Sequence, residues 1–506
     1  MTETSANRIE RQIIYGKLAA LNMHAGERLQ RISRSPLIAE NRMFAAAVLT
    51  PGLELAHQIQ FEPEHLYALR ASVRHAFDVF AYDIAEGDVI VTADPYGGGT
   101  KGQALTMAVP VFVDGELTMF PAIRAQLADL GGEIPGGYNP VAFELWQESV
   151  RITPVKLFAG GKLQRDVFRF LTSNSRTPDW LGADLEAMHS CCREAQRSLL
   201  ELIKQYGDGK VRQSVASMIA YTNAEALRAL PGKGASHEGR AEWTFEEAQG
   251  TVRVHGKREG GRFVFDFAGS SEQGDNPFNC TAETAKACAV AAALADRLDE
   301  LPLNDGLLEA FRFEMPAGSV VAPEFPAATA LGGSVTGHAV AAAVTDALGG
   351  GGKRAQDRGG NADAAYPAVH GNGPWAMLYA PIGSPKVVPL RVDPGFPSSP
   401  GGWGPSGLYG SGRLASAEEM ETGYGFRLER RERTDDRGGG MDVRLRILEG
   451  EWEFKVFSPD KSALTVRAAT ESDGSRPQVL KSGDLLEFRY AGPNTSGKNG
   501  GEADGA

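Results

Sequence analysis

The sequence predicts a multi-domain fold of the α+β class, with mixed α/β structure, and three observations lead to it. Apolar residues recur every three or four positions in 8–32, 185–202 and 211–230, which is typical of amphipathic helices. In 89–120 and 243–267, short or alternating apolar runs separated by glycines are typical of strands. The chain has 506 residues, 42% of them hydrophobic, so it is long enough for two or three domains.

Charge and hydropathy narrow the class of protein. The net charge is −12, so the chain has no basic excess with which to displace counterions from nucleic-acid phosphates. The sequence contains no uninterrupted apolar run long enough to cross a membrane, and its first residues lack the basic and apolar parts of a signal peptide. We therefore expect a cytoplasmic protein that binds neither nucleic acid nor membrane.

Residues 1–232 are predicted to form an N-terminal mixed α/β domain. Its first helix covers about 8–32. A long helix through 185–202 is expected to end at Gly207, because glycine is common just after a helix. A second helix over about 211–230 follows, and the two are expected to form a helical hairpin that closes the domain.

The rest of the chain is predicted to contain four further segments. Residues 233–348 combine an antiparallel meander with alanine-rich helices, as an α+β middle domain. Glycine and proline dominate 349–415, which predicts a long excursion of loops without regular structure. A β-rich segment follows over 416–493, and the polar residues 494–506 are expected to be a disordered tail.

The four cysteines do not suggest a disulfide framework or a metal site. Cys191 and Cys192 are adjacent, whereas Cys280 and Cys288 are eight positions apart without a neighbouring histidine. We expect buried thiols that pack as small apolar side chains.

The densest candidate motif is the run Asp94-Pro95-Tyr96-Gly97-Gly98-Gly99-Thr100-Lys101, directly after a predicted strand. Its glycines let backbone N–H groups approach a ligand closely. A phosphate-binding P-loop reads GxxxxGK[ST] and opens a helix, whereas Lys101 precedes Gly102 with no Ser or Thr after it. The spacing therefore disfavours nucleotide binding at this loop.

Two further blocks follow, AIRAQLADLGGEIPGG at 122–137 and QESVRITPVKL at 147–157. Together with 94–100 they resemble the hydantoinase B/oxoprolinase family, whose members typically read DPYxGGTH, AxRAHHAD with GGxxPG, and QEGxRIPPVKL. Further matches in the same order, such as Asn174-Ser175-Arg176-Thr177-Pro178, extend the resemblance over about 8–345. The C-terminal third matches weakly.

The resemblance implies a hetero-oligomeric enzyme. In this family a B-type chain works beside an A-type chain that binds ATP and phosphorylates the substrate, and the pair hydrolyses cyclic amides such as hydantoins or 5-oxoproline. Related acetone and acetophenone carboxylases join a ketone enolate to activated bicarbonate. We therefore expect A-type partner subunits, with room for a small additional subunit, and ATP with Mg bound in a partner and not in this chain.

The family's metal ligands are replaced in this sequence. The resemblance implies a divalent metal held by the His of GTH, an Asp three positions later and the first His of RAHHAD. These positions are Lys101, Ala104 and Gln126 here, and Leu127 replaces the second His. A charged ammonium cannot bind a cation and alanine offers no donor, so we predict no metal in this chain.

Two interpretations of the vacated site stay open. In the first, Lys101 and Arg124 supply the positive charge that the metal would have given and hold a carboxylate, bicarbonate or enolate oxygen. In the second, the pocket is inactive and the chain is a scaffold for catalytic partners. Asp129 and Glu148 are candidates to orient these cations or to act as a base, and equally to cap backbone N–H groups of the glycine-rich loops.

The candidate residues are therefore few. The catalytic candidates are Lys101, Arg124, Asp129 and Glu148, and the substrate-binding candidates are Asp94, Tyr96, Gly98, Gly99, Thr100 and Gln126. For Asp94, a structural role within its own turn is favoured.

Among the family's activities, the sequence favours an acetophenone-carboxylase-like ketone carboxylase. A metal-independent B-type chain suits chemistry in which phosphorylation elsewhere activates both bicarbonate and ketone. The alternatives are the B-type chain of an ATP-dependent hydantoinase or 5-oxoprolinase, and a non-catalytic scaffold.

Overall fold

The computed structural model describes most of residues 5–348 and a set of shorter segments beyond them. Before residue 349 the described residues exclude 40–41, 61–63, 82, 233, 235 and 246–247. After it they are 375–379, 387–391, 417–419, 421, 426–433, 441–448, 451–457, 464–468 and 478–490. They fall into two compact units, one with the residues up to Leu348 and the other with those from Trp375.

The N-terminal unit is built on a sheet that has eight strands among the described residues, paired antiparallel. The strand order is β2-β1-β6-β4-β3-β7-β8, with β5 paired to β6. The strands are β1 (Phe44–Leu49), β2 (Leu55–Gln60), β3 (Val89–Ala93), β4 (Ala104–Ala108), β5 (Val111–Val113), β6 (Glu116–Gln126), β7 (Ile152–Ala159) and β8 (Lys162–Leu163). The strands predicted between 89 and 120 are confirmed.

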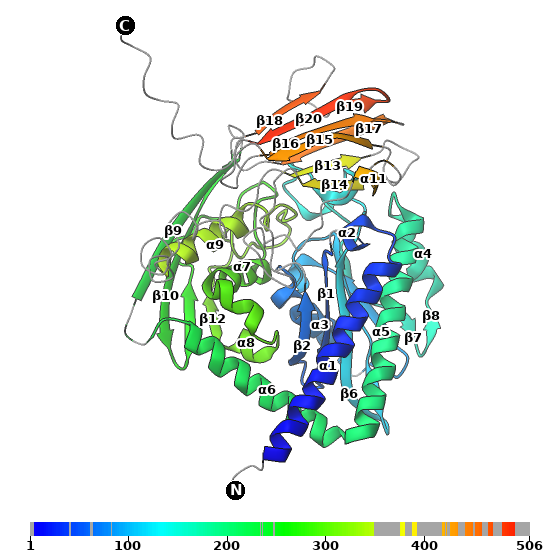
Figure 1. The fold of residues 1–506 in the computed structure, drawn as a ribbon, viewed down its shortest axis with the longest axis vertical. Helices are drawn as coiled ribbons and strands as arrows, with labels where there is room; N and C mark the ends of the chain where they lie inside the picture. Colours follow the sequence, from blue (N-terminus) through cyan, green and yellow to red (C-terminus); the bar gives the residue numbers. More distant parts are fainter. Residues whose placement is uncertain are drawn as a thin grey trace. The chain divides into compact units, whose positions relative to one another are not determined.

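Helices cover both faces of this sheet (Figure 1). Along β1, Ala45 packs into one core and its neighbour Phe44 into another, because successive side chains of a strand point to opposite faces. The covering helices are α3 (His65–Phe80) on the first face and α5 (Pro178–Tyr206) on the second, and α7 (Ala282–Leu294) packs against α3. The strand is therefore apolar throughout.

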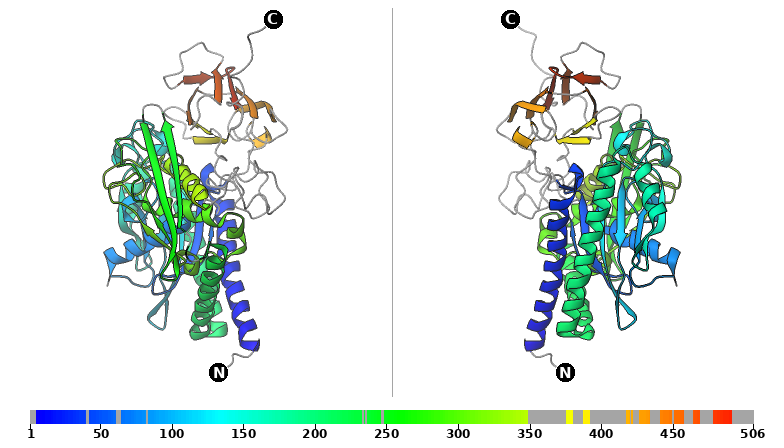
Figure 2. Two further views of the ribbon diagram at one scale, coloured as in Figure 1. Left: turned by 90° about the vertical axis from the view of Figure 1, so that its left-hand side faces the viewer. Right: turned by 90° about the vertical axis from the view of Figure 1, so that its right-hand side faces the viewer.

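Three long helices confirm the periodicity in the first part of the sequence. They are α1 (Ser5–Ile32), α5 and α6 (Asp208–Ala229), and α1 lies along α5 and also contacts α6 (Figures 1 and 2). Gly207, with φ +83°, separates α5 from α6. In Figure 1, α6 leaves the end of α5 at an angle, so the helical hairpin is open, and α1 shares a core with both of its arms.

A second sheet follows in the same unit, in the order β12-β11-β10-β9. Its members are β9 (Ser236–Phe245), β10 (Ala248–Glu259), β11 (Arg262–Asp266) and β12 (Phe311–Glu314). The predicted antiparallel meander is confirmed, and β12 adds a parallel edge. Phe263 of this sheet and Phe120 of the first belong to one core, together with α7 and α9 (Thr336–Ala347). Residues on both sides of position 232 thus pack together, and a domain boundary there stays a prediction.

Among its described residues, the C-terminal unit has two sheets of four strands each, in the orders β14-β13-β17-β19 and β15-β16-β20-β18. Its strands are β13 (Trp375–Tyr379), β14 (Val387–Arg391), β15 (Phe426–Arg433), β16 (Met441–Ile447), β17 (Glu451–Phe457), β18 (Leu464–Ala468), β19 (Gln478–Lys481) and β20 (Leu485–Tyr490). The strands expected within 416–493 are confirmed, and the tail 494–506 lies outside the described residues.

The prediction of loop throughout 349–415 is wrong at β13 and β14. The two apolar runs pair antiparallel, and Pro389 is tolerated because β14 is an edge strand of its sheet. The glycine and proline residues around these two runs favoured a prediction of loop. The remainder of 349–415 lies outside the described residues.

The described residues also form the short helices α2 (Pro36–Ala39), α4 (Arg165–Ser173), α8 (Asp305–Glu309) and α11 (Ala417–Glu419), and the 3-10 turns η1 (Pro95–Gly97), η2 (Pro135–Gly137), η3 (Leu145–Gln147) and η4 (Ala295–Glu300). In the part of the chain that the structure describes, no helix is both long and apolar enough to span a membrane. The mixed α+β, multi-domain architecture predicted from the sequence is confirmed.

Candidate functional site

The glycine-rich run forms the connection between β3 and β4, and its first residue has a structural role. Asp94 caps η1 by accepting a hydrogen bond from the Tyr96 backbone N–H at 3.0 Å, and its second oxygen accepts one from Arg151 Nη2 at 2.9 Å. Gly98 has φ +86°, and a Cβ there would lie 2.7 Å from the Ala71 carbonyl carbon. Asp94 and Gly98 therefore shape this loop against α3.

Tyr96 points away from the loop toward a later part of the chain. Its hydroxyl donates to the Ala327 carbonyl oxygen, and its ring packs edge-on against Phe325 with centroids 5.5 Å apart. Burial raises the pKa of this phenol above its usual range, so the group is neutral at ordinary pH. These contacts give Tyr96 a packing role, and its candidacy as a substrate contact stays a prediction.

Lys101 is buried in an ion pair that the sequence did not reveal. Its Nζ lies 2.7 Å from Oε1 of Glu64, and only 3% of either side chain is exposed. Glu64 directly precedes α3. The Nζ also donates to the Tyr138 hydroxyl at 3.3 Å and lies 5.5 Å from the centre of that ring. The ammonium is thus held between a carboxylate and a phenol.

The register of the sheet brings the other motif positions to the same place. Ala104 is opposite Gln126 where β4 pairs with β6, and Thr106 is opposite Arg124. The amide Nε2 of Gln126 donates to the Tyr138 hydroxyl, the same oxygen that Lys101 contacts. Positions 101 and 126 therefore converge on Tyr138.

Arg124 extends this polar cluster inside the protein. It is fully buried, and its guanidinium donates to the hydroxyls of Thr106 at 2.8 Å and Thr100 at 2.9 Å. The imidazole of His65 is fully buried as well, and burial lowers its pKa to about 3, so it is neutral at physiological pH. The structure thus brings together Lys101, Arg124, Thr100 and Gln126, as the resemblance suggests.

Asp129 takes the capping role. Its carboxylate accepts hydrogen bonds from the Gly136 N–H at 3.1 Å and from the Arg176 N–H at 2.6 Å, and it pairs with the Arg176 guanidinium at 3.2 Å. These contacts fasten the GGEIPGG loop to the segment before α5. A role as a catalytic base stays a prediction.

Glu148 is buried and holds a distant part of the chain. Its Oε1 accepts from the backbone N–H groups of Thr329 at 3.0 Å and Ala330 at 2.8 Å. Burial raises its pKa to about 8, although these two N–H groups and the charge of Lys101 act in the opposite direction. A pKa near neutrality would suit a base, but the contacts are those of a cap.

The family metal does not fit this cluster. At the implied ligand positions, the ammonium of Lys101 already pairs with Glu64, and the methyl group of Ala104 offers no donor. Within the described residues, no group of three or more His, Cys, Asp or Glu side chains is arranged to hold a metal ion. All four cysteines are buried free thiols, as expected.

Three residues of the cluster were missed in the sequence: Glu64, His65 and Tyr138. Glu64 and His65 stand where an amphipathic helix begins, and their burial depends on packing against other elements. Tyr138 directly follows the GGEIPGG block, so its position beside a family motif was the available signal.

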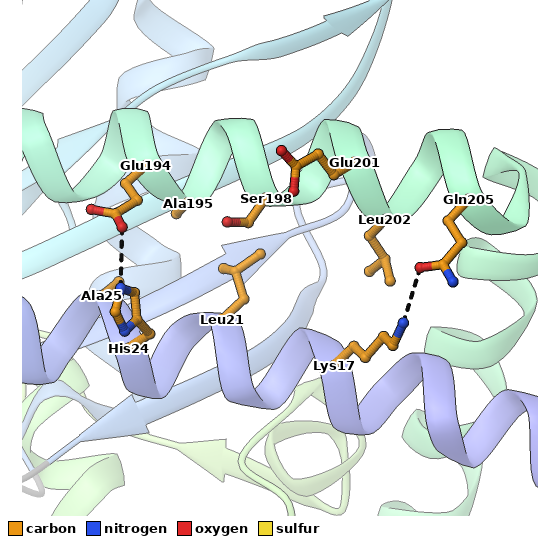
Figure 3. Close-up of a pocket in the computed structure, with 10 residues that line it drawn as sticks. All are labelled: Lys17, Leu21, His24, Ala25, Glu194, Ala195, Ser198, Glu201, Leu202 and Gln205. Carbon is orange, nitrogen blue, oxygen red and sulfur yellow. Dashed lines mark hydrogen bonds and ion pairs between the residues drawn. The ribbon is translucent and has the colours of Figure 1, made fainter.

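A separate groove lies between α1 and α5 (Figure 3). Its volume is about 300 Å³. Lys17 donates to Gln205 at 2.9 Å, and His24 pairs with Glu194 at 3.1 Å, so polar contacts bridge the groove at two points. It is lined by Lys17, Leu21, His24, Ala25, Glu194, Ala195, Ser198, Glu201, Leu202 and Gln205. These residues lie outside the motif blocks, so we place the candidate site at Lys101.

Gly102 supports the position of Lys101, and its replacement should disturb the loop. A Cβ at Gly102 would lie 1.7 Å from the Ser149 Oγ and 2.8 Å from the Ser149 Cβ. We expect Gly102→Ala to lower the free energy of unfolding by about 1–3 kcal/mol through overpacking. Gly16→Ala is the matched control, because nothing lies within 4 Å of a Cβ there, and alanine should stabilise α1. Urea unfolding of both variants gives the comparison, and equal stabilities would contradict the close packing at Gly102.

The fold and the glycine-rich loop define a protein of mixed sheets and helices whose motif blocks surround one buried polar cluster. A family model described as hydantoinase B/oxoprolinase matches residues 7–442, and the chain belongs to this family.

Several named proteins are similar to this chain. The beta subunit of the caprolactamase of Pseudomonas jessenii is 34% identical over 206 residues, covering 41% of this chain and 36% of that protein. The B chain of a putative D-/L-hydantoinase from a Pseudomonas species is 27% identical over 361 residues, covering 67% and 60%. The 5-oxoprolinase 1 of Arabidopsis thaliana is 28% identical over 378 residues, covering 69% and 30%. The matches thus span from under a third to about three fifths of these relatives' lengths.

Two solved structures share the fold. An ATP-dependent caprolactamase from Pseudomonas jessenii superposes with a TM-score of 0.80 at 23% identity, covering 97% of this chain and 91% of that one. A nucleotide-free acetone carboxylase superposes with a TM-score of 0.77 at 15% identity, covering 97% and 76%. At these identities the likeness concerns the fold.

Proposed function

We propose that this chain is the B-type subunit of an ATP-dependent multi-subunit enzyme that acts on a carbonyl compound. ATP and Mg are bound by an A-type partner, in the cytoplasm, and this chain supplies a metal-independent site. The observation that carries the proposal is the Lys101–Glu64 ion pair at the position where the resemblance implies a metal ligand. A small additional subunit completes the proposed hetero-oligomer.

The ion pair favours carboxylation of a ketone, as in an acetophenone-carboxylase-like enzyme. Hydrolysis of an amide needs an activated water, which a metal provides by lowering the pKa of the water it binds. An ammonium neutralised by a carboxylate does not replace that effect. Carboxylation uses a carbon atom of the ketone as the nucleophile. Forming that nucleophile needs only hydrogen-bond donors that stabilise the developing enolate oxygen.

Cyclic amide hydrolysis is the second candidate, and the names of the relatives favour it. Similar proteins belong to a caprolactamase, a putative hydantoinase and a 5-oxoprolinase. The third candidate is a scaffold without chemistry of its own. It is supported by the buried ion pair, because the Lys101 ammonium is already neutralised by the Glu64 carboxylate.

Turnover by the purified complex separates the candidates. The chain is co-purified with its A-type partner and supplied with MgATP, labelled bicarbonate and acetophenone, or with MgATP and ε-caprolactam. We expect ATP-dependent incorporation of label into acid-stable product. Lactam hydrolysis without such incorporation would replace the carboxylase by the amidohydrolase.

The double variant Glu64→Gln/Lys101→Met tests the scaffold alternative in the same assay. It removes both charges of the pair together, so the chain is expected to fold and to co-purify with its partner. Loss of turnover in the assembled complex supports a site in this chain, whereas full turnover would support the scaffold.

A further inference from the structure

The surface of the N-terminal unit carries an aromatic patch, which consists of Val141, Phe143, Trp146 and Phe325. The exposed fractions of these side chains are 72%, 52%, 52% and 42%. The rings of Trp146 and Phe325 pack edge to face with centroids 5.2 Å apart, so the patch joins two segments that are far apart in the sequence. Exposed apolar patches rich in aromatic residues are typical of protein–protein interfaces. We propose that the aromatic patch docks the A-type partner subunit, on a surface of that subunit with an apolar centre and a basic rim.

Backbone pairing holds the two segments of the patch together. The Leu145 N–H donates to the Pro326 carbonyl oxygen at 2.8 Å, and the Ala328 N–H donates to the Phe143 carbonyl oxygen at 3.2 Å. The buried Glu148 carboxylate accepts from the two N–H groups that follow Ala328. The patch is therefore fixed to the interior of the unit.

The Gln147 amide fixes the loop that carries most of the patch. Its Oε1 accepts from the backbone N–H groups of Phe143 at 2.8 Å and Glu144 at 3.1 Å, and its Nε2 donates to Glu133 at 3.2 Å. Because a backbone N–H can only donate, the first two contacts set the orientation of the amide. An apolar surface held in one conformation has little ordering to lose when a partner binds.

The border of the patch is acidic, which indicates the charge of its partner. Glu133 and Glu324 are exposed, and Glu144 is half-buried. The Arg151 guanidinium at the same border is paired with Asp94 at 2.9 Å, so its charge is already balanced. A surface with Lys or Arg at its rim complements these carboxylates.

A second copy of this chain is a poor occupant for the same reason. In a two-fold dimer the patch would face the identical patch, and the carboxylates at its border would meet one another. The net charge of −12 adds to this repulsion.

The position of the patch fits a catalytic partner. Phe325 packs against Tyr96 of the glycine-rich loop with ring centroids 5.5 Å apart, and Trp146 directly precedes the motif block at 147–157. A subunit docked on the patch would therefore lie beside the motif blocks. The inference rests on the proposed function, since that function supplies the A-type subunit.

Binding without turnover tests the inference. The full-length chain is passed over immobilised A-type subunit in a surface plasmon resonance experiment, as wild type and as Trp146→Ala. A central aromatic residue contributes strongly to an interface, so we expect the Kd to rise about 10-fold or more. Tyr221→Ala is the matched control, because Tyr221 is 51% exposed and lies on α6, and its Kd should equal that of wild type.

Charge reversal at Glu324 tests the basic rim in the same experiment. Glu324→Lys should slow association by about 3-fold or more at low ionic strength, and added salt should reduce the difference. Glu86→Lys is the control, because Glu86 is exposed and precedes the start of β3, whereas the patch adjoins the loop after its end. Equal association rates for the two variants would contradict a basic rim.

The outcomes separate this inference from the proposed function. If wild type binds the A-type subunit and Trp146→Ala binds equally well, the inference is overturned and the proposed function stands. If wild type does not bind an A-type subunit, both fail.

Val141→Lys provides the test if Trp146→Ala does not fold. The Val141 side chain is 72% exposed, so its replacement leaves the core intact. A positive charge within the patch should raise the Kd about 10-fold or more, because it would be desolvated against an apolar surface. An unchanged Kd would show that the A-type subunit docks elsewhere.

Discussion

Replacement of Lys101 by methionine is expected to lower the free energy of unfolding of the N-terminal unit by about 3–5 kcal/mol. The change leaves the Glu64 carboxylate buried without the ammonium that lies 2.7 Å from it. A buried charge that loses its partner retains the full cost of its desolvation, which explains the size of the effect. Urea unfolding monitored by circular dichroism measures it.

The control for this prediction removes both charges. In Glu64→Gln/Lys101→Met no ion remains to be desolvated, so most of the lost stability should return. The single variants Glu64→Gln and Lys101→Met complete the comparison. If the stability lost in the double variant equals the sum of the losses in the two single variants, Glu64 and Lys101 are not coupled and the ion pair does not fill the metal position.

Replacement of Glu148 by alanine is expected to cost roughly 2–6 kcal/mol, because two buried backbone N–H groups lose their acceptor. These are the N–H groups of Thr329 and Ala330, which donate at 3.0 and 2.8 Å to the Glu148 Oε1. Glu148→Gln keeps an oxygen for both and should cost much less. Thermal unfolding at pH 6 compares the two variants.

The same residue predicts a pH dependence. Burial raises the pKa of Glu148 from the ordinary carboxyl value of 4.5 to about 8 in the folded protein. The unfolded chain therefore releases the proton at lower pH than the folded one, and the stability due to the neutral acid is lost as the pH rises from about 4.5 to 8. The difference in unfolding free energy between wild type and Glu148→Gln should fall across this range, and a constant difference would contradict a neutral Glu148.

The sequence was informative where structure depends on near neighbours. The helices α1, α5 and α6 follow from apolar spacing within a few turns, and Gly207 marks a real helix end. The meander of β9 to β11 follows from alternation in the same way. The strands β13 and β14 were hidden, because their pairing outweighs the local preference of surrounding glycine and proline residues.

The candidate site, in contrast, depends on contacts between residues that are far apart in the sequence. Motif order placed Lys101, Arg124 and Gln126 together, and the register of β4 with β6 explains why they meet. The partners of these residues come from elsewhere: Glu64 from the start of α3 and Tyr138 from a loop after β6. The Glu148 cap joins groups 181 positions apart, a pairing that local spacing in one sequence does not reveal.

We infer that the buried Lys101–Glu64 ion pair has replaced the family's metal in this chain. The decisive measurement is the metal content of the purified chain, obtained by inductively coupled plasma mass spectrometry after gel filtration in metal-supplemented buffer. We predict no stoichiometric divalent metal in wild type. One divalent ion bound per chain, and lost in the Glu64→Gln/Lys101→Met variant, would show that the metal site is retained.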